Sequence, residues 1–192
     1  MIAHPYPKTP PQDYLTQERQ AKFKSEYIDG DVVAMTGASR QHNLISLNIA
    51  ASLHSQLRYR PCEIYMGDMR VAVDQEEFYT YPDIVVACED PQFLDGELDT
   101  LLNPTLLIEV LSPSTASYDR GEKFSRYRQL SSLQEYLIVA QSTPALEHYR
   151  KQNEREWILI DITDCEALVE LPSIQCQLAM RDIYEKVNFD SE

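Results

Sequence analysis

Thr105-Leu106-Leu107-Ile108-Glu109-Val110-Leu111 is the stretch that decides the fold of this chain. Its apolar residues run without alternation, which predicts a strand buried on both faces inside a sheet. Glu109 places a carboxylate in that run, and burying a carboxylate is costly unless it is paired or binds a metal ion. We favour a functional site at Glu109. The alternatives are a structural salt bridge and an edge-strand glutamate that faces water.

Strand and helix patterns extend outward from this segment in both directions. Alternating or apolar stretches predict strands at 63–66, 69–74, 79–87, 135–140, 145–151, 156–161 and 167–171. Helical spacing and composition predict helices at 14–24, 39–58, 115–129 and 178–185. Asp29-Gly30 suggests a tight hairpin turn, and residues 89–103 read as an acidic loop. The order of these elements predicts an α/β fold with a mixed β-sheet flanked by helices and additional β-hairpins.

The length of 192 residues fits one domain. Residues 1–11 contain four prolines and little that could be buried, so we expect an extended N-terminal arm there. Residues 12–192 then form the single domain. Its composition, 43% hydrophobic and 25% charged, is that of an ordinary globular protein.

The charge of the chain is strongly negative, with 17 basic and 31 acidic residues and a formal net charge of −14. This charge opposes nonspecific attraction to a phosphate backbone. Carboxylates that bind divalent cations would reverse part of it locally, so a nucleic-acid partner stays open.

The cysteines and the N-terminal residues indicate the compartment. Cys62, Cys88, Cys165 and Cys176 are irregularly spaced without a CxxC pair, so neither a zinc site nor a disulfide framework is predicted, and we expect reduced thiols. The first twelve residues have prolines where a signal peptide has an apolar stretch, and no run approaches the roughly 18 apolar residues of a membrane span. We therefore expect a cytoplasmic protein with no membrane partner.

Asp83 is the second acidic candidate, because it follows Pro82 and opens an apolar strand segment. Taken alone, a Pro-Asp pair is more often a turn element. Presented beside Glu109 by a neighbouring strand, Asp83 would complete the hard oxygen site that Mg²⁺ or Mn²⁺ prefers. We predict that Asp83 and Glu109 are the metal ligands.

Asp119, Lys123 and Tyr127 follow one another at i,i+4 spacing in the helix predicted at 115–129, so they share one face. An exposed Asp–Lys pair beside a packing tyrosine is the alternative. A lysine on that face could instead reach the site of Glu109, orient the attacking water and neutralise charge on the phosphate.

Several different short motifs follow one another along the chain. They are Glu26-Tyr27-Ile28-Asp29-Gly30, His42-Asn43-Leu44-Ile45, Tyr81-Pro82-Asp83-Ile84-Val85, Ile108-Glu109-Val110-Leu111-Ser112-Pro113-Ser114-Thr115, Asp119-(x3)-Lys123-(x3)-Tyr127 and Leu133-Gln134-Glu135-Tyr136. Together they resemble the Uma-two family of restriction endonucleases, in the PD-(D/E)XK superfamily. The resemblance spans nearly the whole chain beyond the arm.

This resemblance implies a restriction-endonuclease-like fold and a divalent-metal nuclease centre, with Asp83 and Glu109 at the two acidic motif positions. The superfamily pattern has a lysine two residues after the second acid, where this chain has Leu111. Lys123 is the nearest substitute, which implies an amine delivered from the helix.

Glu26 and His42 match two further family positions and are supporting candidates. Glu26 would bind the metal or orient a water. A surface glutamate and a helix N-terminal histidine with a local hydrogen bond are the alternatives.

The leading prediction is a metal-dependent endonuclease that hydrolyses DNA phosphodiester bonds with Mg²⁺ or Mn²⁺. Lys123 would support the water and the transition state, and Tyr127 would position Lys123. Two alternatives remain: a catalytically inactive nuclease-like binding or regulatory module, and a metal-dependent hydrolase of another phosphate ester. No base-reading motif is visible, and a homodimer stays open.

Overall fold

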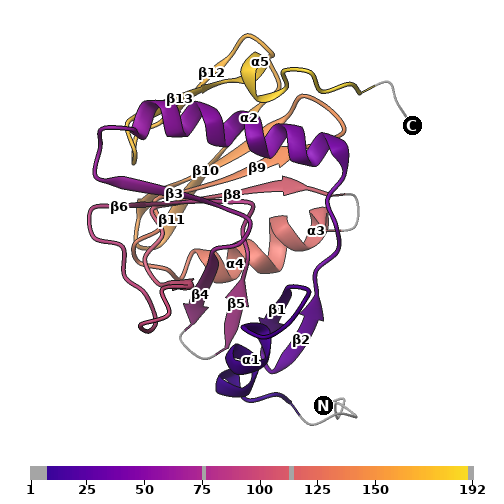
Figure 1. The fold of residues 1–192 in the computed structure, drawn as a ribbon. Helices are drawn as coiled ribbons and strands as arrows, with labels where there is room; N and C mark the ends of the chain where they lie inside the picture. The colour runs from indigo at the N-terminus through magenta and orange to yellow at the C-terminus, as the bar shows by residue number, and fades with distance from the viewer. Residues whose placement is uncertain (1–7, 75–76, 113–114, 190–192) are drawn as a thin grey trace.

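The centre of the molecule is a six-stranded mixed sheet with helices on both faces (Figure 1). The computed structural model describes residues 8–74, 77–112 and 115–189. The sheet has the order β11-β10-β9-β8-β6-β3, with β8 and β9 parallel and the other neighbours antiparallel. Its strands are β3 (Cys62–Met66), β6 (Ile84–Cys88), β8 (Leu106–Leu111), β9 (Glu135–Ala140), β10 (Leu146–Asn153) and β11 (Glu156–Ile162). The predicted mixed sheet flanked by helices, with additional hairpins, is confirmed.

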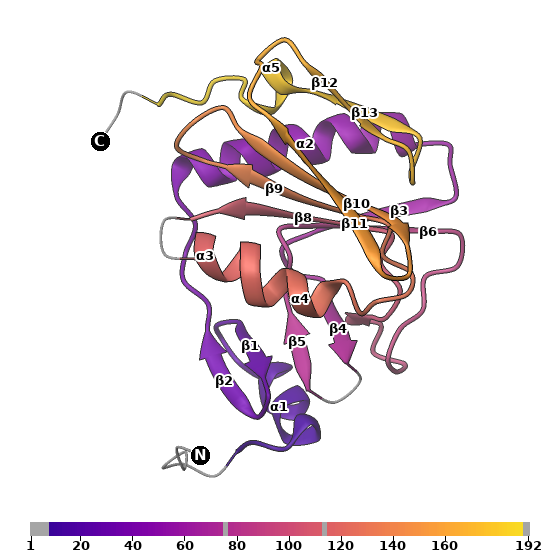
Figure 2. The same ribbon diagram turned by 180° about the vertical axis from the view of Figure 1, so that it is seen from behind.

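Helical segments cover the two faces of this sheet (Figures 1 and 2). One face carries α2 (Arg40–Leu57). The other carries α3 (Ala116–Tyr118), a single π-helical turn η1 (Asp119–Lys123) and α4 (Phe124–Tyr127). This second segment connects the parallel strands β8 and β9, which need such a crossover. The helix predicted at 115–129 is therefore present, but its middle turn is π-helical.

Strand β8 lies between β6 and β9 and is buried along its whole length. Ile108 and Val110, on either side of Glu109, belong to the core cluster that contains the buried residues of α2. Leu111 belongs instead to the cluster of Tyr127. Since side chains alternate between the faces of a strand, Glu109 and Leu111 share the face opposite α2. The alternative of an edge-strand glutamate is wrong.

A second, five-stranded sheet lies below the first in Figure 1. Its order is β2-β1-β5-β4-β7. The strands are β1 (Ser25–Ile28), β2 (Asp31–Ala34), β4 (Arg70–Asp74), β5 (Phe78–Thr80) and β7 (Thr100–Leu101). The predicted turn at Asp29-Gly30 joins β1 to β2, and both residues have positive φ, which a tight turn of this kind requires. Short β7 lies within the segment predicted as an acidic loop.

The N-terminal predictions need correction. The first helix is α1 (Pro11–Glu18), which begins inside the predicted arm and ends six residues before Lys24. Its packing residues, Tyr14 and Leu15, lie in the first turns, and the following segment has nothing to bury, so a helix gains no stability there. Residues 8–10 also belong to the fold, because the N–H of Thr9 donates to the carbonyl of Gly30. Residues 1–7 of the predicted arm lie outside the described residues.

The strand predicted at 79–87 is divided into β5 and β6, which belong to different sheets. Pro82 lies at the break, where its missing N–H cannot pair in a ladder. The chain passes from one sheet to the other there, which places Asp83 at the junction of the two sheets. The carbonyl of Asp83 accepts from the N–H of Gly67 at 3.0 Å.

The C-terminal part covers α2 with the hairpin β12 (Leu168–Leu171) and β13 (Cys176–Ala179) and with α5 (Met180–Ile183). The prediction of a helix at 178–185 is thus wrong for residues 178 and 179, which are the last two residues of β13. Among the described residues, no helix has both the length and the apolar character needed to cross a lipid bilayer.

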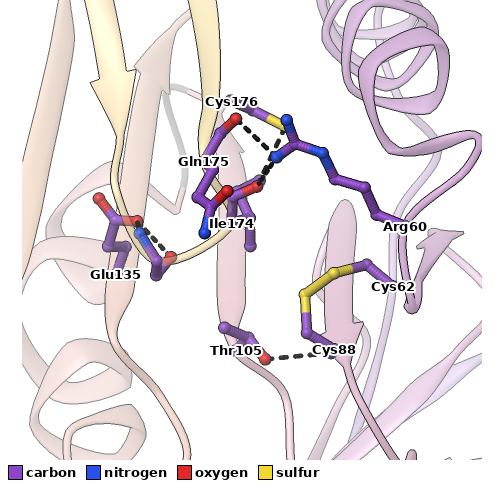
Figure 3. The surroundings of a disulfide bond; sticks show 9 residues. Arg60, Cys62, Cys88, Thr105, Glu135, Ile174, Gln175 and Cys176 are labelled. Carbon is purple, nitrogen blue, oxygen red and sulfur yellow. Dashed lines mark hydrogen bonds between the residues drawn. A yellow bond between two sulfur atoms is a disulfide. The ribbon is translucent and has the colours of Figure 1, made fainter.

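Cys62 and Cys88 form a disulfide, which corrects the expectation of reduced thiols. They are directly opposite each other in the antiparallel pair of β3 and β6 (Figure 3). The N–H of Cys88 also donates to the hydroxyl of Thr105 at 3.1 Å. Cys165 and Cys176 are free. Spacing along the chain could not reveal this pair, because the strand register brings the two residues together.

We expect reduction of the Cys62–Cys88 bond to lower the free energy of unfolding by about 2–4 kcal/mol, because the bond restricts the unfolded chain. Urea unfolding with and without dithiothreitol measures this difference. Cys165→Ser, at an exposed free cysteine, is the control and should leave the difference unchanged. Complete alkylation of Cys62 and Cys88 in the unreduced, denatured protein would show that the bond is absent.

Candidate active site

Glu109 is buried on β8, with 5% of its surface exposed, and one of its oxygens has two donors. The hydroxyl of Tyr127 donates to Oε1 at 2.8 Å, and Nζ of Lys123 lies 2.9 Å from the same atom. Tyr127 was predicted to position Lys123, but its hydroxyl holds the glutamate. Its ring still lies beside the amine, with Nζ 6.0 Å from the ring centroid.

Lys123 is surrounded by carboxylates. Besides Glu109, its Nζ lies 3.2 Å from Oε1 of Glu26 and 3.7 Å from Oδ1 of Asp119. Both Asp119 and Lys123 are buried, so the alternative of an exposed i,i+4 pair is wrong. The π-helical turn η1 contains both residues, and π-helical turns occur frequently at functional sites.

Thr80 connects Glu26 to Tyr127 from strand β5. Its hydroxyl donates to Oε1 of Glu26, and its Oγ1 lies 3.4 Å from the hydroxyl of Tyr127. Hydroxyl and carboxylate groups therefore run continuously from Glu26 through Thr80 and Tyr127 to Glu109. Thr80 could not be predicted from the sequence as a site residue, because a threonine in a strand segment has no signal that separates it from a packing residue.

Asp83 lies beside β8, next to Glu109 in the chain's fold, and has its own partners. Its Oδ2 accepts from the N–H of Val110 at 2.7 Å and lies 3.1 Å from Nε2 of His42. His42 is held in the first turn of α2, where its N–H donates to the side chain of the N-cap Ser39 at 3.0 Å. The structure thus brings Asp83 and His42 together, as a pair next to the Glu109–Lys123 pair.

Burial and like charges control the ionisation of the site. Burial raises the pKa of Glu109 to about 8; Lys123 opposes this shift, and the charges of Asp83 and Asp119 add to it. Burial also raises the pKa of Asp119, again opposed by Lys123. Burial alone would lower the pKa of Lys123, but Glu109, Glu26 and Asp119 raise it well above its ordinary value. The amine therefore stays charged at neutral pH.

The hydroxyl of Tyr118 is buried, and no hydrogen-bond partner for it is found among the described residues. Burial raises the pKa of this hydroxyl, and the charge of Glu26 raises it further while Lys123 lowers it. Buried hydroxyls are rarely without a partner, so this one is available to a group bound in the site. Tyr118 could not be predicted from the sequence as a site residue, because an isolated tyrosine in a helix most often packs.

Oxygen ligands for a hard cation are present at Asp83 and Glu109. No group of three or more His, Cys, Asp or Glu side chains in the described part of the chain is arranged to hold a metal ion. Mg²⁺, however, is often held by one or two protein carboxylates, with water and substrate phosphate as its other ligands. Burial raises the pKa of Glu109, and a nearby positive charge such as that of Lys123 opposes this shift. The donor set therefore fits Mg²⁺ or Mn²⁺.

Leu111 occupies the motif position at which the superfamily pattern has a lysine. Leu111 shares the face of Glu109 and is buried against the cluster of Tyr127, so no amine reaches the site from β8. Pro113 and Ser114, in the motif after Glu109, lie outside the described residues.

We expect the free energy of unfolding of the metal-free protein to fall as the pH rises from about 4.5 to about 8. Glu109 keeps its proton to about pH 8 in the folded protein, against an ordinary pKa of 4.5 in an unfolded chain. Between these values the folded state binds more protons, so stability decreases with pH, by at most about 1.4 kcal/mol per pH unit for one proton. Urea unfolding over this range measures the slope. The side-chain amide of the Glu109→Gln variant cannot titrate, so the free energy of unfolding of this variant should change less with pH. A slope identical to that of the wild type would contradict the assignment of this titration to Glu109.

Comparison with solved structures defines the class of fold. The crystal structure of a "putative nuclease belonging to DUF820" from Anabaena variabilis ATCC 29413 matches with a TM-score of 0.75, covering 93% of this chain and 99% of that chain at 19% identity. The predicted restriction-endonuclease-like α/β fold is therefore confirmed, since this chain and that structure share their fold.

The family follows from sequence comparison. The model of the Uma2 family, described as "Putative restriction endonuclease", matches residues 11–181, and the chain belongs to this family. Two relatives come from Synechocystis sp. (strain ATCC 27184 / PCC 6803 / Kazusa). "Uncharacterized protein sll1609" is 39% identical over 158 residues, 82% of this chain and 89% of that protein. "Uncharacterized protein slr1290" is 35% identical over 193 residues, 98% of this chain and 100% of that protein.

Proposed function

We propose that this protein is a divalent-metal-dependent endonuclease that hydrolyses DNA phosphodiester bonds at Glu109. The observation that supports this most is an excess of carboxylates around one buried lysine. Among the described residues, Glu26, Glu109 and Asp119 lie within 3.7 Å of its amine, and the charge of Asp83 also acts on Glu109. A structural salt bridge needs only one acid, and the others cost stability, as is common where a site serves function.

Asp83 and Glu109 would hold the ion. A bound Mg²⁺ or Mn²⁺ lowers the pKa of a coordinated water and stabilises charge on the phosphate oxygens. Since Tyr127 donates to Oε1 of Glu109, it fixes the orientation of that carboxylate, and His42 does the same for Asp83. This arrangement keeps both acids in place before substrate enters.

Lys123 would act on the phosphate. Its pKa is raised, so the amine keeps its proton and cannot serve as a general base. A buried ammonium group instead stabilises the negative charge that develops on the phosphate in the transition state. The structure therefore favours electrostatic stabilisation over proton abstraction as its role.

The net charge of −14 favours one other candidate, a nuclease-like module that binds a protein partner without cleaving DNA. Incubation with supercoiled plasmid separates the two. We expect nicked and linear DNA with Mn²⁺ or Mg²⁺ and none with EDTA. An intact plasmid under every metal, together with no heat of Mn²⁺ binding in calorimetry, would refute the nuclease proposal.

A further inference from the structure

One long segment of this acidic chain carries no acid at all. Residues 32–62 contain no aspartate or glutamate, whereas the whole chain has 31. The segment includes the part of β2 after Asp31, all of α2 and the turn after α2. Its basic residues are Arg40, Arg58 and Arg60, with histidines at His42 and His54. The segment itself therefore adds no negative charge that would repel a polyanion.

The acid-free segment begins beside the candidate active site. Val33 pairs with Glu26 in the β1–β2 ladder, so the two side chains share a face of the hairpin. Further along, Nε2 of His42 lies 3.1 Å from Oδ2 of Asp83. In Figures 1 and 2 the N-terminal end of α2 lies at the same side of the molecule as the start of α3. A ligand at the site would thus meet α2 directly.

Helix α2 presents a line of exposed residues away from the sheet. Its buried residues, such as Ile45, Ile49 and Leu53, pack on the sheet. Arg40 and Arg58 are both exposed and are about five turns apart, so they lie on one line along the helix. Leu47, 56% exposed, and Ala51, also exposed, lie between them.

The ends of this line differ in their surroundings. The guanidinium of Arg58 lies over the ring of Tyr59, 5.6 Å from its centroid, and Tyr59 is 91% exposed. Arg60 is also exposed, but its guanidinium donates to the carbonyls of Ile174 and Gln175 and is not counted as part of this line (Figure 3). The outer face of α2 is therefore defined by Arg40, Leu47, Ala51 and Arg58.

We propose that the outer face of α2 is a surface on which the phosphate backbone of a DNA duplex lies, with the Arg40 end of this face nearest the candidate active site. This inference rests on the proposed function. Charge complementarity favours it, because arginines bind phosphates and the face carries no carboxylate. The line from Arg40 to Arg58 is about 27 Å long, at 1.5 Å per residue, which corresponds to roughly eight base pairs at 3.4 Å each.

Binding of a fluorescently labelled duplex of roughly 20 base pairs in EDTA tests this surface, measured by anisotropy over a series of salt concentrations. We expect Arg40→Ala and Arg58→Ala each to weaken binding several-fold and the double variant on the order of tenfold. Each should also reduce the slope of log K against log salt by about 0.9 per lost phosphate contact. Arg155→Ala, an exposed arginine in the β10–β11 turn, removes the same charge and should change neither quantity.

Two outcomes would overturn the inference. One is a wild-type protein that does not bind the duplex, and the other is a double variant that binds like Arg155→Ala. Melting temperatures equal to that of the wild type show that each variant is folded. Hydrolysis of bis(p-nitrophenyl) phosphate by the wild type with Mn²⁺ is measured in parallel. Arginine-dependent binding without any hydrolysis would refute the proposed function but would still support the proposed DNA-binding surface.

Discussion

Glu109→Gln is expected to reduce metal-dependent DNA cleavage by a factor on the order of 100 to 1000 and to leave the metal-free protein at least as stable as the wild type. The amide keeps the size of the side chain and still accepts from Tyr127, but it removes a charged ligand of the ion. It also ends the repulsion from Asp83 and Asp119 that contributes to the raised pKa of Glu109. Sites built for function often gain stability when such a group is removed.

Initial rates of plasmid nicking, Mn²⁺ calorimetry and urea unfolding measure these effects. Glu166→Gln, at an exposed position, is the matched control and should match the wild type in all three. If Glu109→Gln unfolds in metal-free buffer while Glu166→Gln does not, Glu109 is a structural partner of Lys123, and the metal role fails.

Lys123→Met is expected to lower the free energy of unfolding by about 3–5 kcal/mol at neutral pH, since it leaves buried carboxylates without their cation. Cleavage should also fall by a factor on the order of 100. The variant should be stabilised more than the wild type by Mn²⁺, because an ion would then supply the missing positive charge. Lys123→Arg should restore cleavage poorly, as the larger planar group does not place its charge where the ammonium lies.

Thermal melting with and without Mn²⁺, beside cleavage rates, tests this second prediction. Lys186→Met removes an exposed lysine and serves as the control. Lowering the pH should return part of the lost stability to Lys123→Met, because protonated acids no longer repel one another. A variant as stable as Lys186→Met, and equally active, would show that Lys123 has neither role.

The sequence pattern around Glu109 was sufficient to predict the central strand and a buried polar site on it. A short apolar run predicts a buried strand, and a carboxylate inside it needs a partner, so β8 and an unusual site could be predicted from local chemistry. The i,i+4 spacing of Asp119, Lys123 and Tyr127 likewise placed them on one face, which a π-helical turn in the middle did not disturb.

Tertiary structure decided what depends on register and on contacts between distant segments. The Cys62–Cys88 bond arises from the pairing of β3 and β6, and Thr80 reaches Glu26 because the chain changes sheets at Pro82. Neither of these two contacts has a signal in the local sequence. Both depend on strand register, and the free energy that selects a register comes from burying whole faces of strands. Periodicity in the sequence therefore determined which side chains share a face, and only packing of those faces decided which of them meet.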